Sequence, residues 1–318
     1  MPVRLIHRLI AALGALFLAQ AASAGCTTAP GAVTFANSAS YDVKAQVVPN
    51  ASGAAGLSCT GTLLSLLGGG YAKATLTSVN GYTLTNGSDA ISYQVAADSG
   101  FTQAFSTSTP TIDFMNASLL SLLGLNNMNN FAANFYARLT SAPNIPDGTY
   151  TDTIHVSWNY YICNGVQIGQ LCVLYETGTK NVDVTVSLTV AKDCKINAPN
   201  VNFGSAALAS QFGQVSQAVQ VDCTKNAVYK VAFSSGNSGT SRPWRTMSDG
   251  NGHTLQYNLY QSDGTTIWDQ TNPVTSSQVG TGATTPTQMQ SYIAKINTAQ
   301  ATPAAGTYTD NVSVVISF

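Results

Sequence analysis

The chain of 318 residues carries little charge. Asp, Glu, Lys and Arg together make up 8% of it, and its formal net charge is −1. Proteins that bind nucleic acid neutralise its phosphates with clustered Lys and Arg. No such cluster occurs here, so nucleic acid is not an expected partner. Gly, Ser, Thr, Asn and Val are abundant instead, which favours strands and turns over helices.

Signatures of catalysis and of cofactor binding are also scarce. The sequence has no Cys-x-x-Cys pair, and His155 and His253 are isolated, so no metal site is expected. It has neither a Gly-x-Ser-x-Gly elbow nor a phosphate-binding loop. A glycosidase-like pair of carboxylates remains an alternative, but turn capping explains the few acids better. Those acids are Asp98, Asp113, Asp147 and Asp152. We therefore expect neither an enzyme nor a cofactor.

The sequence lacks an apolar run long enough to span a bilayer. The run Leu9–Ala19 has eleven residues, whereas a spanning helix needs about 20. Arg4 and Arg8 precede this run, and Ala22-Ser-Ala24 follows it as a small-x-small cleavage site. This pattern predicts a signal peptide over residues 1–24 and export to the periplasm. The even number of cysteines, six, agrees with an oxidising compartment.

One stretch has the pattern of a half-buried strand. In Val182-Asp-Val-Thr-Val-Ser-Leu-Thr-Val190, apolar residues alternate with polar ones throughout. Burying its five apolar side chains would stabilise a sandwich by roughly 7–15 kcal/mol as an upper estimate. That value rivals the net stability of a whole domain, about 5–15 kcal/mol. A sandwich without such a strand should therefore not be stable alone.

The sequence contains an internal repeat. Gly148-Thr-Tyr-Thr-Asp152 recurs as Gly306-Thr-Tyr-Thr-Asp310, and each segment opens an alternating strand. A second pair of similar segments, Ile91–Gly100 and Leu255–Gly264, precedes the Gly-Thr-Tyr-Thr-Asp segment in each repeat. The repeat predicts an all-β protein of two tandem immunoglobulin-like β-sandwich domains.

The repeat also predicts domain bounds and disulfides. The domains should cover about 25–191 and 192–318 with almost no linker. Cys26–Cys59 and Cys194–Cys223 occupy matching positions, so each pair should tie the first strand of its domain to a later one. Cys163–Cys172 would then close a hairpin.

The two repeats end differently. The first continues into Val182–Val190, whereas the second ends at Asn311–Phe318 with no counterpart of that strand. The second domain should therefore present an unpaired edge and an open apolar groove. A strand from another chain would fill this groove. The predicted lining residues are Val312, Val314, Ile316 and Phe318.

Several segments of the second repeat carry a family resemblance. They are Cys194, Phe203-Gly204, Cys223-Thr224, Arg245-Thr-Met247, Leu255–Tyr260 and Gly306–Phe318. Together they resemble the spore coat protein U domain, which is also the pilin domain of archaic, Csu-type chaperone–usher pili. The resemblance is strong over the second domain and looser over the first. It implies a subunit that lacks its last strand, which the N-terminal extension of the adjacent pilin supplies. It also implies a periplasmic chaperone that fills the groove first and an outer-membrane usher that assembles the fibre.

The predicted mature chain differs from a shaft pilin of that family. A donor extension must precede the first cysteine, yet only Gly25 lies there. Such a subunit could accept a strand but not donate one, so the resemblance implies a tip adhesin at the cell surface. The alternatives are a secreted, spore-coat-like structural protein and a glycan-binding surface protein.

The first repeat is longer than the second at three places, and all three insertions are apolar. Added surface loops are usually polar, so we expect these loops to bind hydrophobic surfaces, either abiotic or on a host, and to support biofilm formation. The alternative is that they are core, with Leu119–Leu125 forming a short helix over the sandwich. The candidate residues are Leu63, Leu64, Leu66, Leu67, Leu119, Leu120, Leu122, Leu123, Leu125, Tyr161, Ile162, Val166, Ile168 and Leu171.

Overall fold

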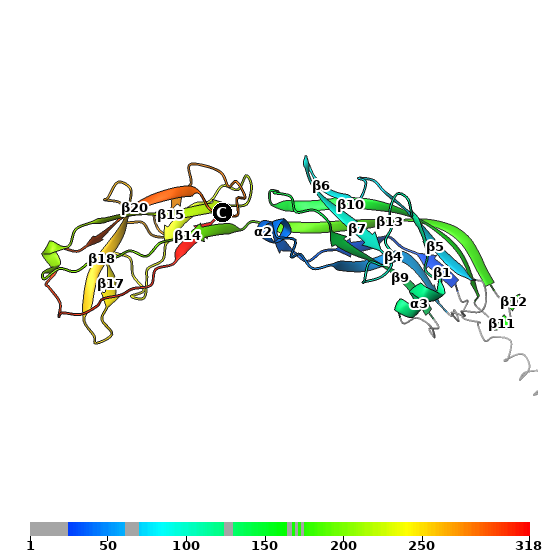
Figure 1. Ribbon diagram of the computed structural model, residues 1–318, viewed down its shortest axis with the longest axis horizontal. Helices are drawn as coiled ribbons and strands as arrows, with labels where there is room; N and C mark the ends of the chain where they lie inside the picture. Colours follow the sequence, from blue (N-terminus) through cyan, green and yellow to red (C-terminus); the bar gives the residue numbers. More distant parts are fainter. Residues whose placement is uncertain (1–24, 61–69, 124–129, 164–166, 169–170, 173–174) are drawn as a thin grey trace, which may run out of the picture. The chain divides into compact units, whose positions relative to one another are not determined.

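The computed structural model describes residues 25–60, 70–123, 130–163, 167–168, 171–172 and 175–318 (Figure 1). Its backbone groups into two compact units. The first contains the chain up to Ala36, Val48–Ser141 and Tyr150–Leu188, and the second contains Asn37–Val47, Ala142–Thr149 and Thr189–Phe318. The domain bounds 25–191 and 192–318 stay a prediction, because compactness alone does not show that a segment folds independently.

The protein is all-β, as predicted, and most of its elements are strands. Before residue 192 these are β1 (Gly25–Thr28), β2 (Gly31–Thr34), β3 (Ser38–Ala39), α2 (Ser40–Lys44), β4 (Ala51–Thr60), β5 (Tyr71–Ser78), β6 (Thr83–Asn86), β7 (Asp89–Ala96), β8 (Thr111–Asp113), α3 (Ala117–Leu122), β9 (Asn130–Leu139), β10 (Gly148–Cys163), β11 (Gln167–Ile168), β12 (Leu171–Cys172) and β13 (Tyr175–Ala191). Strands β10 and β13 are the longest of these and run alongside the rest of the sandwich (Figure 1).

One large sheet forms the first sandwich. Its strand order is β3-β13-β2-β4-β9-β7-β6-β10-β5-β8, and β1 pairs with β4 beside this path. Strand β13 also pairs with β10, which closes the sheet around a core. Trp158 is fully buried in that core, and its indole Nε1 donates to the carbonyl of Ala55 at 3.0 Å.

The elements of the second sandwich are β14 (Cys194–Asn197), η2 (Ala209–Gln211), β15 (Val215–Cys223), β16 (Lys230–Phe233), β17 (Arg245–Ser248), β18 (Thr254–Gln261), β19 (Val274–Thr275), β20 (Gln288–Ile296) and β21 (Val314–Ser317). They form a five-stranded sheet in the order β14-β15-β20-β18-β17 and a three-stranded sheet in the order β19-β16-β21. Trp268 lies at the centre of its core, against the rings of Phe233 and Tyr292.

Two of the three predicted disulfides are confirmed. Cys26 is bonded to Cys59 across β1 and β4, and Cys194 is bonded to Cys223 across β14 and β15. Each bridge ties the first strand of its sandwich to a later one, as the repeat predicted. The pairing of Cys163 with Cys172 involves side chains outside the described residues. Within the part of the chain that the structure describes, no helix is both long and apolar enough to cross a membrane.

Candidate functional site

The last strand of the first sandwich is present and buried along one face. Val184, Val186 and Leu188 of β13 are fully buried, and the polar residues between them point away from the core. The strand runs parallel to β2, with Val186 opposite Val33, and pairs with β10 on its other side. The predicted alternation in Val182–Val190 is confirmed.

The second sandwich has no such strand among the described residues. Strand β21 pairs with β16, where Ile316 lies opposite Val231 and Val314 lies opposite Phe233. In the strand order β19-β16-β21 it is the outer strand. Its free backbone groups on that side form an edge to which another strand can add.

Matching positions of the two repeats show what this open edge exposes. The repeated Gly-Thr-Tyr-Thr-Asp segments align Val312, Val314, Ile316 and Phe318 with Ile154, Val156, Trp158 and Tyr160. All four residues of the first sandwich are buried, with at most 1% of each exposed. In the second sandwich the first three are only partly buried, and Phe318 is 57% exposed. Equivalent residues are therefore covered in one sandwich and open in the other.

The segment that would flank an added strand on its other side also differs in burial between the two sandwiches. Val33 and Phe35 lie seven and nine residues after Cys26, and both are buried beside β13. Val201 and Phe203 lie seven and nine residues after Cys194, but they are only partly buried and belong to no strand. We call β21 together with Val201 and Phe203 the acceptor edge. Its apolar side chains pack against one core cluster, so a single added strand could cover them all.

In each sandwich a tyrosine–carboxylate hydrogen bond connects the two segments that are repeated in the sequence. The hydroxyl of Tyr93 donates to Asp152 at 2.6 Å, and that of Tyr257 donates to Asp310 at 2.6 Å. The tyrosines lie in the repeated segments Ile91–Gly100 and Leu255–Gly264, and each aspartate ends a Gly-Thr-Tyr-Thr-Asp segment. Burial, followed by the hydrogen bond to aspartate, raises the pKa of Tyr93 and of Tyr257. Both hydroxyls therefore stay protonated and can donate over the whole physiological range.

A buried arginine holds the segment next to the acceptor edge through hydrogen bonds. Arg245 is fully buried. Its guanidinium donates to the carbonyl of Ser234 at 3.0 Å, to the carbonyl of Trp268 at 3.0 Å and to the side chain of Asn258. Ser234 follows β16 directly, and its backbone N–H donates to Ser313 at 2.9 Å, just before β21. Arg245 therefore fixes the strand on which β21 is built. In the sequence, Arg245-Thr-Met247 contributes to the family resemblance, but the role of Arg245 depends on contacts between distant segments.

Three of the predicted surface-binding residues are core residues. Leu119 and Leu120 of α3 are each 1% exposed, and Ile162 is fully buried. Ile162 continues the inward-facing series Trp158 and Tyr160 along β10. The helix α3 packs one side against the sandwich, which is the alternative considered for this segment. The prediction that these three residues form a binding surface is wrong.

Other members of the predicted surface are accessible or outside the described residues. Leu122, at the end of α3, is 58% exposed, and Leu123 and Tyr161 are partly exposed. The remaining positions lie where the structure describes no side chain, namely Leu63, Leu64, Leu66, Leu67, Leu125, Val166, Ile168 and Leu171. Their role as a binding surface stays a prediction.

The described residues contain no cluster of three or more His, Cys, Asp or Glu side chains that could hold a metal ion. His155 and His253 each contact one carboxylate instead. Nδ1 of His155 lies 2.7 Å from Asp183, and Nδ1 of His253 lies 2.7 Å from Asp249. The contact with His253, followed by backbone hydrogen bonds, lowers the pKa of Asp249 to about 2.

Comparison with known proteins agrees with this architecture. A family model described as Spore Coat Protein U domain matches residues 12–157 and 179–315, one match to each repeat. A crystal structure of the CsuC–CsuE chaperone–tip adhesion subunit pre-assembly complex, from archaic chaperone–usher Csu pili of Acinetobacter baumannii, is similar in fold. The TM-score is 0.64 at 23% identity, and the similarity covers 92% of this chain and all of the matched chain. A search of curated proteins found no match.

Proposed function

The chain belongs to the Spore Coat Protein U domain family, and from that membership and its open second sandwich we propose that it is the tip subunit of a chaperone–usher pilus. The chain is not an enzyme, because the family and the similar structure are structural and adhesive proteins. The observation that carries the proposal is the exposure of Val314 and Ile316, whose equivalents Val156 and Trp158 are buried.

Strand addition would complete the second sandwich. The inserted strand would lie beside β21 and run parallel to the segment around Val201, as β13 runs parallel to β2. Alternate apolar side chains of this strand would cover the core, and its backbone would satisfy the free edge. In the exported protein a periplasmic chaperone would supply the strand first. An adjacent pilin would replace it with its N-terminal extension at the outer-membrane usher.

The complete first sandwich would then face the environment from the fibre tip. The exposed Leu122 supports an adhesive role, because burying a leucine side chain against an apolar surface lowers the free energy of the system. The apolar insertions that include Leu64 and Ile168 would enlarge this surface. We propose attachment to hydrophobic surfaces, with biofilm formation as the consequence.

Co-expression with the chaperone tests strand acceptance. Ile316→Asp places a charge toward the open core, whereas Ser317→Asp places the same charge on the exposed neighbour of the same strand. The chaperone should purify with the wild type and with Ser317→Asp, but not with Ile316→Asp. Equal recovery of the chaperone with both variants would show that the acceptor edge does not bind it.

A further inference from the structure

One face of the first sandwich carries rows of accessible side chains across three strands. In the pairing of β5 with β10, Tyr71 lies opposite Tyr161 and Thr77 lies opposite His155, with Lys73, Thr75, Ser157 and Asn159 between them. The intervening residues, such as Ala74 and Trp158, point into the core and are fully buried. Strand β13 continues the face, because its Tyr175 packs on Tyr161 and its Asp183 contacts His155.

Three tyrosines form a ladder at one end of this face. The ring centroids of Tyr71 and Tyr161 are 6.2 Å apart, and those of Tyr161 and Tyr175 are 5.1 Å apart. In both pairs the ring planes are within 29° of parallel. Nζ of Lys73 lies 5.0 Å from the centroid of Tyr71, and Tyr175 remains 58% exposed. Core packing does not account for three aromatic rings aligned on an outer face.

A hollow of about 450 Å³ continues along the same strands from this tyrosine ladder. The side chains around it offer hydroxyl, imidazole, amide and carboxylate groups, which include both donors and acceptors. They are Thr75, Thr77, His155, Ser157, Asn181 and Asp183. Tyr161 and His155 are six residues apart on β10, so the face is about 20 Å long at ~3.3 Å per residue.

We propose that this face binds an extended, neutral polysaccharide. The C–H groups on the face of a sugar ring carry slight positive charge and pack on aromatic π-systems, which the tyrosine ladder supplies. The hydroxyl groups of the following sugars are donors and acceptors, which the hollow matches. The site does not depend on the proposed pilus function, and Tyr161 is the one residue that it shares with the predicted hydrophobic surface.

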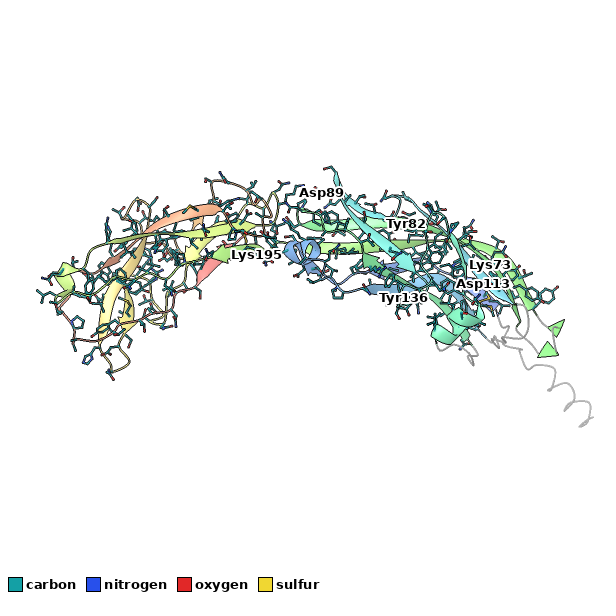
Figure 2. All side chains as sticks on the ribbon, viewed as in Figure 1. Lys73, Tyr82, Asp89, Asp113, Tyr136 and Lys195 are labelled. Carbon is teal, nitrogen blue, oxygen red and sulfur yellow. A yellow bond between two sulfur atoms is a disulfide. The ribbon has the colours of Figure 1, made fainter. Side chains whose placement is uncertain are left out.

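The charges and the sheet order exclude two other kinds of ligand. Lys73 is balanced by the partly exposed Asp113 opposite it (Figure 2). Asp183 is already in contact with His155. A polyanion therefore gains little attraction here. A peptide strand would need a free edge, but β5 lies between β8 and β10, and β10 lies between β5 and β13. Recognition must therefore use side chains.

Native affinity electrophoresis of the full chain tests this proposal. The gels would contain hydroxyethylcellulose, galactomannan or glycol chitin, with alginate as the polyanionic comparison. We expect at least one neutral polysaccharide to retard the wild type. Tyr175→Ala and Asn181→Ala should each weaken its apparent affinity at least tenfold, while Tyr175→Phe, which keeps the ring, should stay within threefold. Tyr136→Ala is the matched control, since this partly exposed tyrosine lies on β9 in another part of the sheet (Figure 2).

Three results would overturn the proposal. They are no retardation by any of the neutral polysaccharides, an equal loss in Tyr136→Ala and Tyr175→Ala, and stronger retardation by alginate. The test needs neither an assembled pilus nor a hydrophobic surface. Its failure would therefore leave the proposed pilus function untouched.

Discussion

At the scale of single residues, the aspartate that ends each Gly-Thr-Tyr-Thr-Asp motif accepts hydrogen bonds from several segments of its sandwich. Asp152 is 2% exposed and accepts hydrogen bonds from Tyr93, from the hydroxyl of Ser78 at 2.6 Å and from the backbone N–H of Thr153 at 2.7 Å. A buried carboxylate is costly unless such donors surround it. The tyrosine hydroxyl therefore contributes through the carboxylate that it satisfies.

Tyr93→Phe tests this contribution. The substitution keeps the ring but removes one donor from a buried carboxylate, so it should destabilise the first sandwich by about 1.5–3 kcal/mol. Urea unfolding of the full chain, followed through the transition of the first sandwich, gives the measurement. Tyr136→Phe, at a partly exposed tyrosine of β9, should change the stability by less than about 0.5 kcal/mol. If the two variants were equally stable, the pair of Tyr93 with Asp152 would not matter for folding.

The raised pKa of Tyr93 predicts how this effect changes with pH. Burial and the bond to Asp152 keep the folded tyrosine protonated, whereas an unfolded tyrosine ionises near pH 10. The stabilisation is therefore complete below pH 10 and is lost as pH rises further, by about 1.4 kcal/mol per pH unit. The unfolded tyrosine is only half ionised at pH 10, and phenylalanine cannot ionise. The gap in unfolding free energy between the wild type and Tyr93→Phe should therefore shrink by about 1 kcal/mol from pH 10 to pH 11. A constant gap over pH 8–11 would contradict this linkage.

At the scale of elements, α3 shows that an apolar insertion can be part core and part surface. The helix has only six residues, yet Leu120 is buried and Leu122 is exposed. Residues two positions apart do not face the same side of a helix. Composition therefore predicts that such a segment is unusual, but only the packed sandwich determines which leucines remain accessible.

The two leucines of α3 make a matched pair for mutation. Leu120→Asp should destabilise the first sandwich by more than about 3 kcal/mol, because it buries an unpaired charge in the core. Leu122→Asp should leave stability within about 0.5 kcal/mol and lower attachment of the assembled protein to plastic. Thermal unfolding and a plate attachment assay separate the two effects. Normal attachment of Leu122→Asp would remove this residue from the proposed adhesive surface.

At the scale of the whole molecule, the repeat was the most informative feature of the sequence. It predicted the all-β fold and two disulfides, because these follow from matched spacing. The alternation of apolar and polar residues in Val182–Val190 predicted the buried face of that strand separately. The burial of Ile162 and the tyrosine ladder were not predicted, and the burial of Leu119 was only the alternative to a binding surface. They depend on which strands become neighbours, and spacing along one chain does not encode that register.

The same repeat predicts a ligand for the acceptor edge from within the chain. Residues 181–191 form the C-terminal part of β13, whose alternate apolar side chains cover the core of the first sandwich. Because Val201 and Phe203 correspond to Val33 and Phe35, a synthetic peptide of this sequence should bind the second sandwich in the same register. At 100 times its dissociation constant, such a peptide should stabilise the second sandwich by about 2.7 kcal/mol.

Thermal unfolding of the full chain with increasing peptide measures this stabilisation. The peptide should not affect the first sandwich, where the covalently linked β13 already occupies the site. A control peptide with Val186→Asp would place a charge against the core and should not stabilise. Val186 of the peptide would pair with Val201, since Val186 of β13 pairs with Val33. Equal stabilisation by both peptides, or by neither, would show that the second sandwich is not completed in the way that the first one is.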